Sequence, residues 1–221
     1  MIRARALTLA LVLVGLVVLP RSGFAAPLGL TPVDDPDIAF FFVDVTYDAT
    51  SDVLDADGFA LTLEHPAGVS NAIAGGFFDL TAVIDDLGNP GAGSLSILGT
   101  VPTLGFGGGT LLTGTLTDFG FRPEGGDPLE FLFDVTGGDA AALYGGLGSS
   151  FGVILSGASF PGSFGSDFNN LGVNIASGSG GGFGDVAPPI PEPGSKILFA
   201  AGLLLVVACV GARGRLADAA G

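Results

Sequence analysis

Residues 129–135 read LEFLFDV and carry the most regular pattern in the central part of the chain. Large apolar side chains alternate strictly with Glu130, Leu132 and Asp134. Successive side chains of a β-strand point to opposite faces, so this alternation is typical of a strand with one buried face. A helix would instead repeat its apolar residues about every 3.6 positions. The segment therefore predicts a half-buried β-strand.

Six further segments carry a strand signal, with many Phe, Val, Leu and Thr residues. They cover 38–47, 58–64, 77–84, 94–98, 110–117 and 151–156. The second of them places Phe59, Leu61 and Leu63 on one face. Turn residues separate the segments, as in the sequence GNPG at 88–91. Seven or more strands joined by short turns predict a mainly β domain, an antiparallel β-sandwich or jelly roll.

Composition excludes several classes of function. The 221 residues include 7 Lys and Arg against 22 Asp and Glu, a formal net charge of −15 at pH 7. This charge repels phosphate backbones, so we expect no nucleic-acid partner. A single Cys cannot form an internal disulfide, and a single His excludes His-rich metal sites. With no Trp and only two Tyr, the composition also argues against a carbohydrate module that stacks sugars on those rings.

Residues 1–25 have the pattern of a secretory signal peptide. Two arginines near the start precede the apolar run 6–19, which is too short to span a bilayer comfortably. Gly23 and Ala25 are small residues at the positions that signal peptidase inspects. We therefore expect a signal helix that directs export across the inner membrane and is removed after Ala25.

The end of the chain contains three elements in a fixed order. They are the motif Pro191, Glu192 and Pro193, the uncharged apolar run 197–212, and the basic residues Arg213 and Arg215. A helix over the apolar run would be about 24 Å long, short for a bilayer but feasible where the bilayer is thin. Basic residues stay on the cytoplasmic side. The run is therefore predicted to be a transmembrane helix that stops transfer with its basic end inside.

This order resembles the PEP-CTERM sorting signal of Gram-negative-type bacteria, here covering 191–215, with a short tail at 216–221. In that family an exosortase, a membrane-embedded cysteine protease, recognises the tail and processes the protein during export. The resemblance implies a transient anchor in the inner membrane, then a place at the cell surface or in the extracellular matrix. It also implies an association with exopolysaccharide or biofilm. It concerns only the end of the chain, so it implies a destination and no activity.

Between the two ends lies one strongly acidic domain. Of the charged residues, 20 acids but only one base, Arg122, fall within 26–190, which leaves a net charge of −19. We predict an exported β-rich domain over 26–176 and a flexible Gly- and Pro-rich spacer over 177–190. Salt bridges cannot be a main support with one Arg, so burial, screening or bound cations must offset the repulsion.

One acidic cluster of the domain comprises Asp48, Asp52, Asp55, Asp57 and Glu64. Read as a calcium loop that ends at Glu64, the segment has Asp55 and Asp57 at ligand positions, but Val53 stands where the first ligating Asp is needed. Calcium binding by Asp55, Asp57 and Glu64 is therefore one interpretation. The other is an acidic hairpin connection in which Asp57 and Gly58 form the turn. We expect no other cofactor.

Two classes of function remain open from the sequence. The first is a non-catalytic surface or matrix protein whose processing partners are signal peptidase and exosortase. The second is a calcium-dependent binding module or weak hydrolase with a site of loop carboxylates. Hydrolysis of glycosides needs two carboxyl groups at a defined separation. With acids throughout the domain, their presence alone does not favour the second class.

Overall fold

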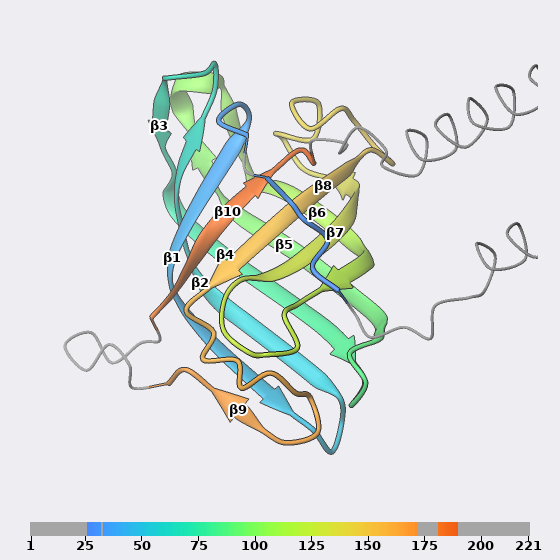
Figure 1. Cartoon of the computed structure of the whole chain (residues 1–221). Helices are drawn as coiled ribbons and strands as arrows, with labels where there is room; N and C mark the ends of the chain where they lie inside the picture. Colours follow the sequence, from blue (N-terminus) through green and yellow to red (C-terminus); the bar gives the residue numbers. More distant parts are fainter. Residues whose placement is uncertain (1–25, 32, 172–180, 190–221) are drawn as a thin grey trace, which may run out of the picture.

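Eight strands close into an antiparallel barrel in the computed structural model, which describes residues 26–31, 33–171 and 181–189 (Figure 1). The strands are β1 (Asp37–Asp48), β2 (Val53–Glu64), β3 (Ser70–Ala72), β4 (Ala74–Ile84), β5 (Pro90–Val101), β6 (Phe106–Gly120), β7 (Leu129–Gly137), β8 (Ser150–Ser156), β9 (Phe168–Asn169) and β10 (Gly182–Ala187). A short 3-10 helix, η1 (Pro102–Leu104), precedes β6. The barrel follows the order β1-β2-β4-β5-β6-β7-β8-β10 and closes where β10 pairs with β1. All seven predicted strands are present.

The prediction of a mainly β, antiparallel domain is confirmed, but the sandwich or jelly-roll architecture is wrong. Neighbours in the chain are neighbours in the barrel, apart from the small additions β3 and β9. Alternation shows only that one face of each strand is buried, and that holds equally for a sandwich and for a barrel. The architecture therefore depends on which strands meet at the two ends of the sheet.

The closing strand, β10, lies inside the range 177–190 that the sequence predicts as a spacer, so that prediction is wrong for 182–187. Gly184 pairs with Phe40 of β1 and with Leu155 of β8. A Cβ atom at Gly184 would collide with the carbonyl oxygen of Ile154 and lie 2.7 Å from the Phe40 ring. The glycine at this position therefore lets the neighbouring strand and the Phe40 ring approach closely. It does not serve as a flexible link.

Phe side chains fill the interior of the barrel. Phe40, Phe78, Phe131, Phe133 and Phe151 are all fully buried. The rings of Phe40 and Phe78 stack with centroids 4.1 Å apart, and those of Phe133 and Phe151 stack at 5.5 Å. An eight-stranded barrel has an interior that side chains can just fill, and each buried ring removes a large apolar area from water. The interior is a packed core.

Two connections cover the ends of the barrel. The segment between β8 and β9 contributes Phe160 and Phe164, whose rings lie 4.7 Å apart, and Phe164 meets Tyr47 of β1 edge-on at 5.0 Å. At the other end, Tyr144 from the β7–β8 connection is buried and donates its hydroxyl hydrogen bond to the Val186 carbonyl at 2.8 Å. Both ends of the core are therefore shielded from water.

Residues 26–31, here called the N-terminal strap, cross the outside of the barrel (Figure 1). The backbone N–H of Gly29 donates to Glu130 Oε2 on β7 at 2.8 Å. A Cβ atom at Gly120 on β6 would lie 2.6 Å from the backbone nitrogen of Leu28. The strap therefore lies flat on the sheet, and Glu130 is only 5% exposed.

Within the described ranges, no helix has the length and apolar character needed to cross a membrane. The predicted signal helix over 1–25 and the predicted transmembrane helix over 197–212 lie outside the described residues.

Candidate functional site

The three predicted calcium ligands all lie on β2 and do not converge. Asp55 and Asp57 are exposed in the body of the strand, and Glu64 is its last residue. Asp55 Oδ1 accepts a hydrogen bond from the Thr81 hydroxyl at 2.8 Å, whereas Glu64 Oε1 accepts one from the backbone N–H of Gly68 at 2.6 Å. Nowhere in the described part of the chain do three or more His, Cys, Asp or Glu side chains form a group that could hold a metal ion.

The predicted turn at Asp57 and Gly58 is also wrong, because β1 and β2 are joined by a turn at 49–52. Gly58 faces inward, opposite a β-bulge at 41–43 of β1. A Cβ atom at Gly58 would lie 2.8 Å from Val43 Cγ2 and 2.9 Å from Val43 Cα. The glycine therefore makes room for the bulge. An Asp-Gly pair in the sequence does not distinguish this role from a turn.

A row of exposed apolar side chains crosses the outer face of the barrel. Phe41 of β1 pairs with Phe183 of β10 on one side and with Phe59 of β2 on the other. The rings of Phe41 and Phe183 stack at 6.3 Å. On β4 the row continues with Phe77, which pairs with Leu98 of β5. These five side chains, each 36–51% exposed, are called the aromatic row.

Two local features make the aromatic row continuous. Gly58 pairs with Phe78, so the next residues, Phe59 and Phe77, lie side by side. In the bulge of β1, two residues oppose one of β2, and Phe42 adopts a φ of 56°. This backbone region is sparsely populated by bulky residues. Phe42 is 43% exposed as a result and widens the apolar surface.

A row of carboxylates lies next to the aromatic row. Asp44, Asp57 and Asp79 occupy paired positions on β1, β2 and β4 and are called the acidic row. Adjacent strands are about 4.8 Å apart, and like charges directly opposite each other are destabilising. Partial burial raises the pKa of Asp57, and the charges of Asp44, Asp79 and Asp55 raise it further. The row therefore holds negative charge at a cost to the fold.

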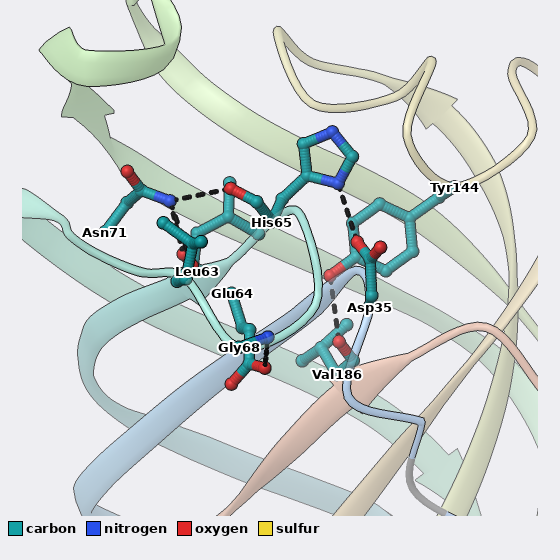
Figure 2. A network of polar contacts seen from close by, with 9 residues as sticks. Asp35, Leu63, Glu64, His65, Gly68, Asn71, Tyr144 and Val186 are labelled. Atoms are coloured by element: carbon teal, nitrogen blue, oxygen red, sulfur yellow. Dashed lines mark hydrogen bonds and ion pairs between the residues drawn. The ribbon is translucent and has the colours of Figure 1, made fainter.

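A second acidic cluster lies where the chain leads into β1 (Figure 2). Asp35 Oδ1 and His65 Nδ1 are 2.6 Å apart, and this hydrogen bond lowers the pKa of Asp35. Asn71 of β3 donates to the His65 carbonyl at 2.9 Å, and Thr103 donates to the side chain of Asn71 at 2.8 Å. These contacts tie the N-terminal segment to β2, β3 and η1, which is a structural role.

Asp37, the first residue of β1, has the most perturbed carboxyl group of this cluster. Burial raises its pKa to about 7, and the charges of Asp185, Glu64 and Asp34 contribute in the same direction. Its Oδ1 atom is buried and accepts no hydrogen bond from any described residue. Asp37 therefore exchanges a proton close to neutral pH.

The predicted processing residues lie outside the described ranges. They are Gly23, Ala25, Pro191, Glu192, Pro193, Arg213 and Arg215. Ala26, the expected first residue after cleavage, is described. Its carbonyl oxygen would lie 2.7 Å from a Cβ atom at Gly120, so this residue packs on the barrel.

Sequence reasoning missed the aromatic row, although one signal for it was present. Phe59, Leu61 and Leu63 were predicted to share one face, but Phe59 and Leu61 are 51% and 40% exposed, and only Leu63 is buried. The useful signal was the run of three consecutive Phe at 40–42. Alternation cannot turn all three inward, so at least one had to face outward.

Comparisons with protein-family models, with curated proteins and with solved structures gave no match for this chain. Its function is therefore inferred from its own residues.

Proposed function

We propose that this chain is an exported, non-catalytic protein of the cell surface or extracellular matrix, sorted by the PEP-CTERM route. The observation that carries the proposal is the order of the C-terminal elements: the Pro191–Pro193 motif, the apolar run 197–212, and then Arg213 and Arg215. The signal peptide delivers the chain to the inner membrane, signal peptidase and an exosortase process it, and the acidic domain is released to associate with exopolysaccharide.

Two features of the domain support a structural or binding role over catalysis. The barrel interior is filled by aromatic rings such as Phe40 and Phe131, whereas small-molecule sites are usually open pockets. The recess beside Asp185, lined also by Leu30 and Pro188, has a volume of about 10 Å³. That is about the space of one water molecule. The exposed outer face is therefore the better candidate for contact with a partner.

The proposal is tested in cells by replacing Pro191, Glu192 and Pro193 with Ala. We expect the altered protein to stay unprocessed in the inner membrane, because the apolar run 197–212 would still anchor it. The matched control replaces Pro188 and Pro189 with Ala, which removes prolines next to the motif and leaves the motif intact. Cell fractionation with mass spectrometry of both mature termini reads the result.

Two outcomes would overturn the proposal. If the variant that lacks the motif reached the surface at the normal rate and size, the tail would not be a sorting signal. If the exported form still began at Met1, rather than at Ala26, the signal-peptide prediction would be wrong.

A further inference from the structure

The aromatic row and the acidic row repeat together on consecutive strands. Each of β1, β2 and β4 contributes one Phe to the aromatic row and one Asp to the acidic row, two or three positions apart. These pairs are Phe41 with Asp44, Phe59 with Asp57 and Phe77 with Asp79. The two rows therefore run in parallel across the strands. In both rows, neighbouring members are one strand separation apart, about 4.8 Å.

The apolar surface is large enough to indicate a partner. The aromatic row crosses five strands, from Phe183 on β10 to Leu98 on β5, which is about 19 Å at the usual strand spacing. Phe42 and Leu61, 43% and 40% exposed, extend it. Contiguous exposed apolar surface of this kind marks an interaction site on soluble proteins.

The charge of the domain indicates that the partner is positively charged. The domain has a net charge of −19, and the acidic row borders the aromatic row on β1, β2 and β4. Burial raises the pKa of Asp57, and the neighbouring carboxylates raise it further, so a positively charged partner would relieve this repulsion. Cations also bind favourably over the faces of aromatic rings. A second copy of the chain would instead bring another 19 negative charges to the interface, and an anionic polymer would be repelled.

The repeat and the paired chemistry of the two rows indicate the kind of polymer. An extended peptide laid across the strands presents side chains to one face every second residue, about 6.6 Å apart, which does not match a repeat of about 4.8 Å. A basic α-helix presents them about every 5.4 Å and comes closer, so the comparison with polylysine below separates a polypeptide from a glycan. A pyranose unit in a linear glycan is close to the strand separation in length. Each amino-sugar unit also carries a C–H face for an aromatic ring and an ammonium group for a carboxylate.

We propose that the two rows bind a linear, cationic amino-sugar polymer laid across β10, β1, β2, β4 and β5. The sugar faces lie on the Phe rings, and the ammonium groups on one side of the polymer pair with carboxylates of the acidic row. This inference rests on the proposed association with exopolysaccharide and names its chemical class. The lack of Trp argued against sugar stacking, and both tyrosines, Tyr47 and Tyr144, are buried. The exposed Phe rings are therefore the rings that stack on the sugars. Their position on the outer face could not be inferred from the composition.

The test is a sedimentation assay with the full-length chain, purified in a nonionic detergent. The probe is insoluble, partly N-deacetylated chitin, and the comparison polymers are cellulose, which lacks ammonium groups, and polylysine beads, which lack sugar rings. We expect retention on the amino-sugar polymer to be at least tenfold stronger than on either comparison polymer.

Two double variants separate the two rows. Phe59→Ser with Phe77→Ser removes rings, and Asp57→Asn with Asp79→Asn removes charges while keeping size. We expect each to weaken retention at least tenfold. The matched control, Asp86→Asn with Glu124→Gln, removes two exposed acids outside the rows and should bind as the parent does. Circular dichroism and thermal melts establish whether each variant is folded. If a double variant is unfolded, the single variant Asp57→Asn replaces it in the assay.

Several results would overturn the inference. If the chain were retained as strongly on cellulose as on the amino-sugar polymer, charge would play no role in binding. If it were retained as strongly on polylysine, the site would bind any polycation. No retention on the amino-sugar polymer, or equal loss in the control variant, would reject the site. If the parent chain sedimented as a dimer and Phe59→Ser made it monomeric, a second copy would be the occupant. Correct sorting in cells without retention would reject this inference alone, and retention without correct sorting would reject only the proposed export route.

Discussion

The outer surface of the barrel has two faces, of which one is covered by another segment of the chain and the other is exposed. The face over β6, β7 and β8 is covered by the N-terminal strap, and the face over β1, β2 and β4 is open. On the covered face, Gly120 and Gly152 present no side chain, and the carboxylate of Glu130 beneath the strap accepts a backbone hydrogen bond. On the open face, Phe59 stands exposed beside Asp57, whose neighbours across the sheet are also carboxylates.

The two faces therefore differ in how much their outward residues contribute to stability. A glycine on the outside lets another segment pack flat on the sheet, and a buried carboxylate there needs a donor to offset its lost hydration. Exposed rings and repelling acids contribute little to the fold. We therefore expect substitutions on the covered face to lower stability. Those on the open face should change binding and leave stability nearly unaltered.

The largest expected effect is that of Gly120→Ala on the covered face. The new Cβ atom would lie 2.6 Å from Leu28 N and 2.7 Å from the Ala26 carbonyl oxygen, both backbone atoms that cannot rotate away. Overpacking of this kind costs about 3 kcal/mol. Denaturant unfolding of the variant measures the loss. The control is Ser96→Ala on β5, next to Asp79 at the edge of the open face, and an equal loss of stability in both variants would contradict the comparison.

Glu130→Ala should follow, with a loss of about 2 kcal/mol. It removes a hydrogen bond to a charged acceptor and leaves the N–H of Gly29 without its partner. Glu130→Gln keeps an acceptor oxygen and should lose less. Glu124→Ala, an exposed acid, should change stability by less than about 0.5 kcal/mol. Hydrogen exchange at Gly29 should speed up in the Ala variant. If that amide were equally protected in both chains, the strap would not depend on Glu130.

Asp37 connects the two faces, because it begins β1 directly after the N-terminal segment. Its pKa is raised to about 7 from an ordinary value of 3.8, so the folded state holds the proton more tightly than the unfolded state. Stability from this group is full below about pH 4 and is lost as the pH rises through about 7. One pKa unit corresponds to about 1.4 kcal/mol. After a reduction for partial exposure, we expect a loss of about 2 kcal/mol.

Asp37→Asn tests this dependence. The variant should match the parent in thermal melts at pH 4 and melt at a higher temperature than the parent at pH 8. Asp86→Asn, an exposed acid away from the cluster, should follow the parent at both values. Melting curves for Asp37→Asn that stay parallel to those of the parent from pH 4 to pH 8 would show that Asp37 is ionised throughout.

On the open face, Asp57→Asn should stabilise the fold at pH 7 by less than about 1 kcal/mol. The raised pKa of Asp57 means that its ionised form is disfavoured in the folded state, and exposure to water keeps the gain small. The gain should disappear below the ordinary pKa of an aspartate, where both chains are neutral at this position. A destabilised variant at pH 7 would mean that the carboxylate makes a favourable contact that outweighs the repulsion.

The smallest expected effect is a difference between calcium and sodium. Both salts should raise the melting temperature by screening the acids, as the Debye length falls from about 30 Å at 0.01 M to about 10 Å at 0.1 M. Because Asp55, Asp57 and Glu64 do not converge, the shift in CaCl₂ should equal that in NaCl at matched ionic strength. An additional stabilisation by calcium that disappears on substitution of Asp55 and Asp57 would restore the calcium interpretation.

The strands themselves were predictable because alternation is a local property. The pattern LEFLFDV at 129–135 determines a strand with a buried face, and β7 (Leu129–Gly137) forms there. The acidity of the domain and the order of elements at 191–215 are likewise properties of the sequence alone. The strand β10 was not predictable in this way, because a Gly-rich segment such as 182–187 has few side chains to alternate and resembles a linker.

Tertiary structure alone decided the closure of the barrel and the use of its outer faces. Closure depends on β10 pairing with both β8 and β1, and its pairs with β1, such as Phe183 with Phe41, join residues more than a hundred positions apart. An outward residue also looks the same in the sequence whether a strap covers it, as with Glu130, or water does, as with Asp57. Register brings Asp44, Asp57 and Asp79 into one row, and register is set by the strand pairings of the closed sheet, the bulge at 41–43 included.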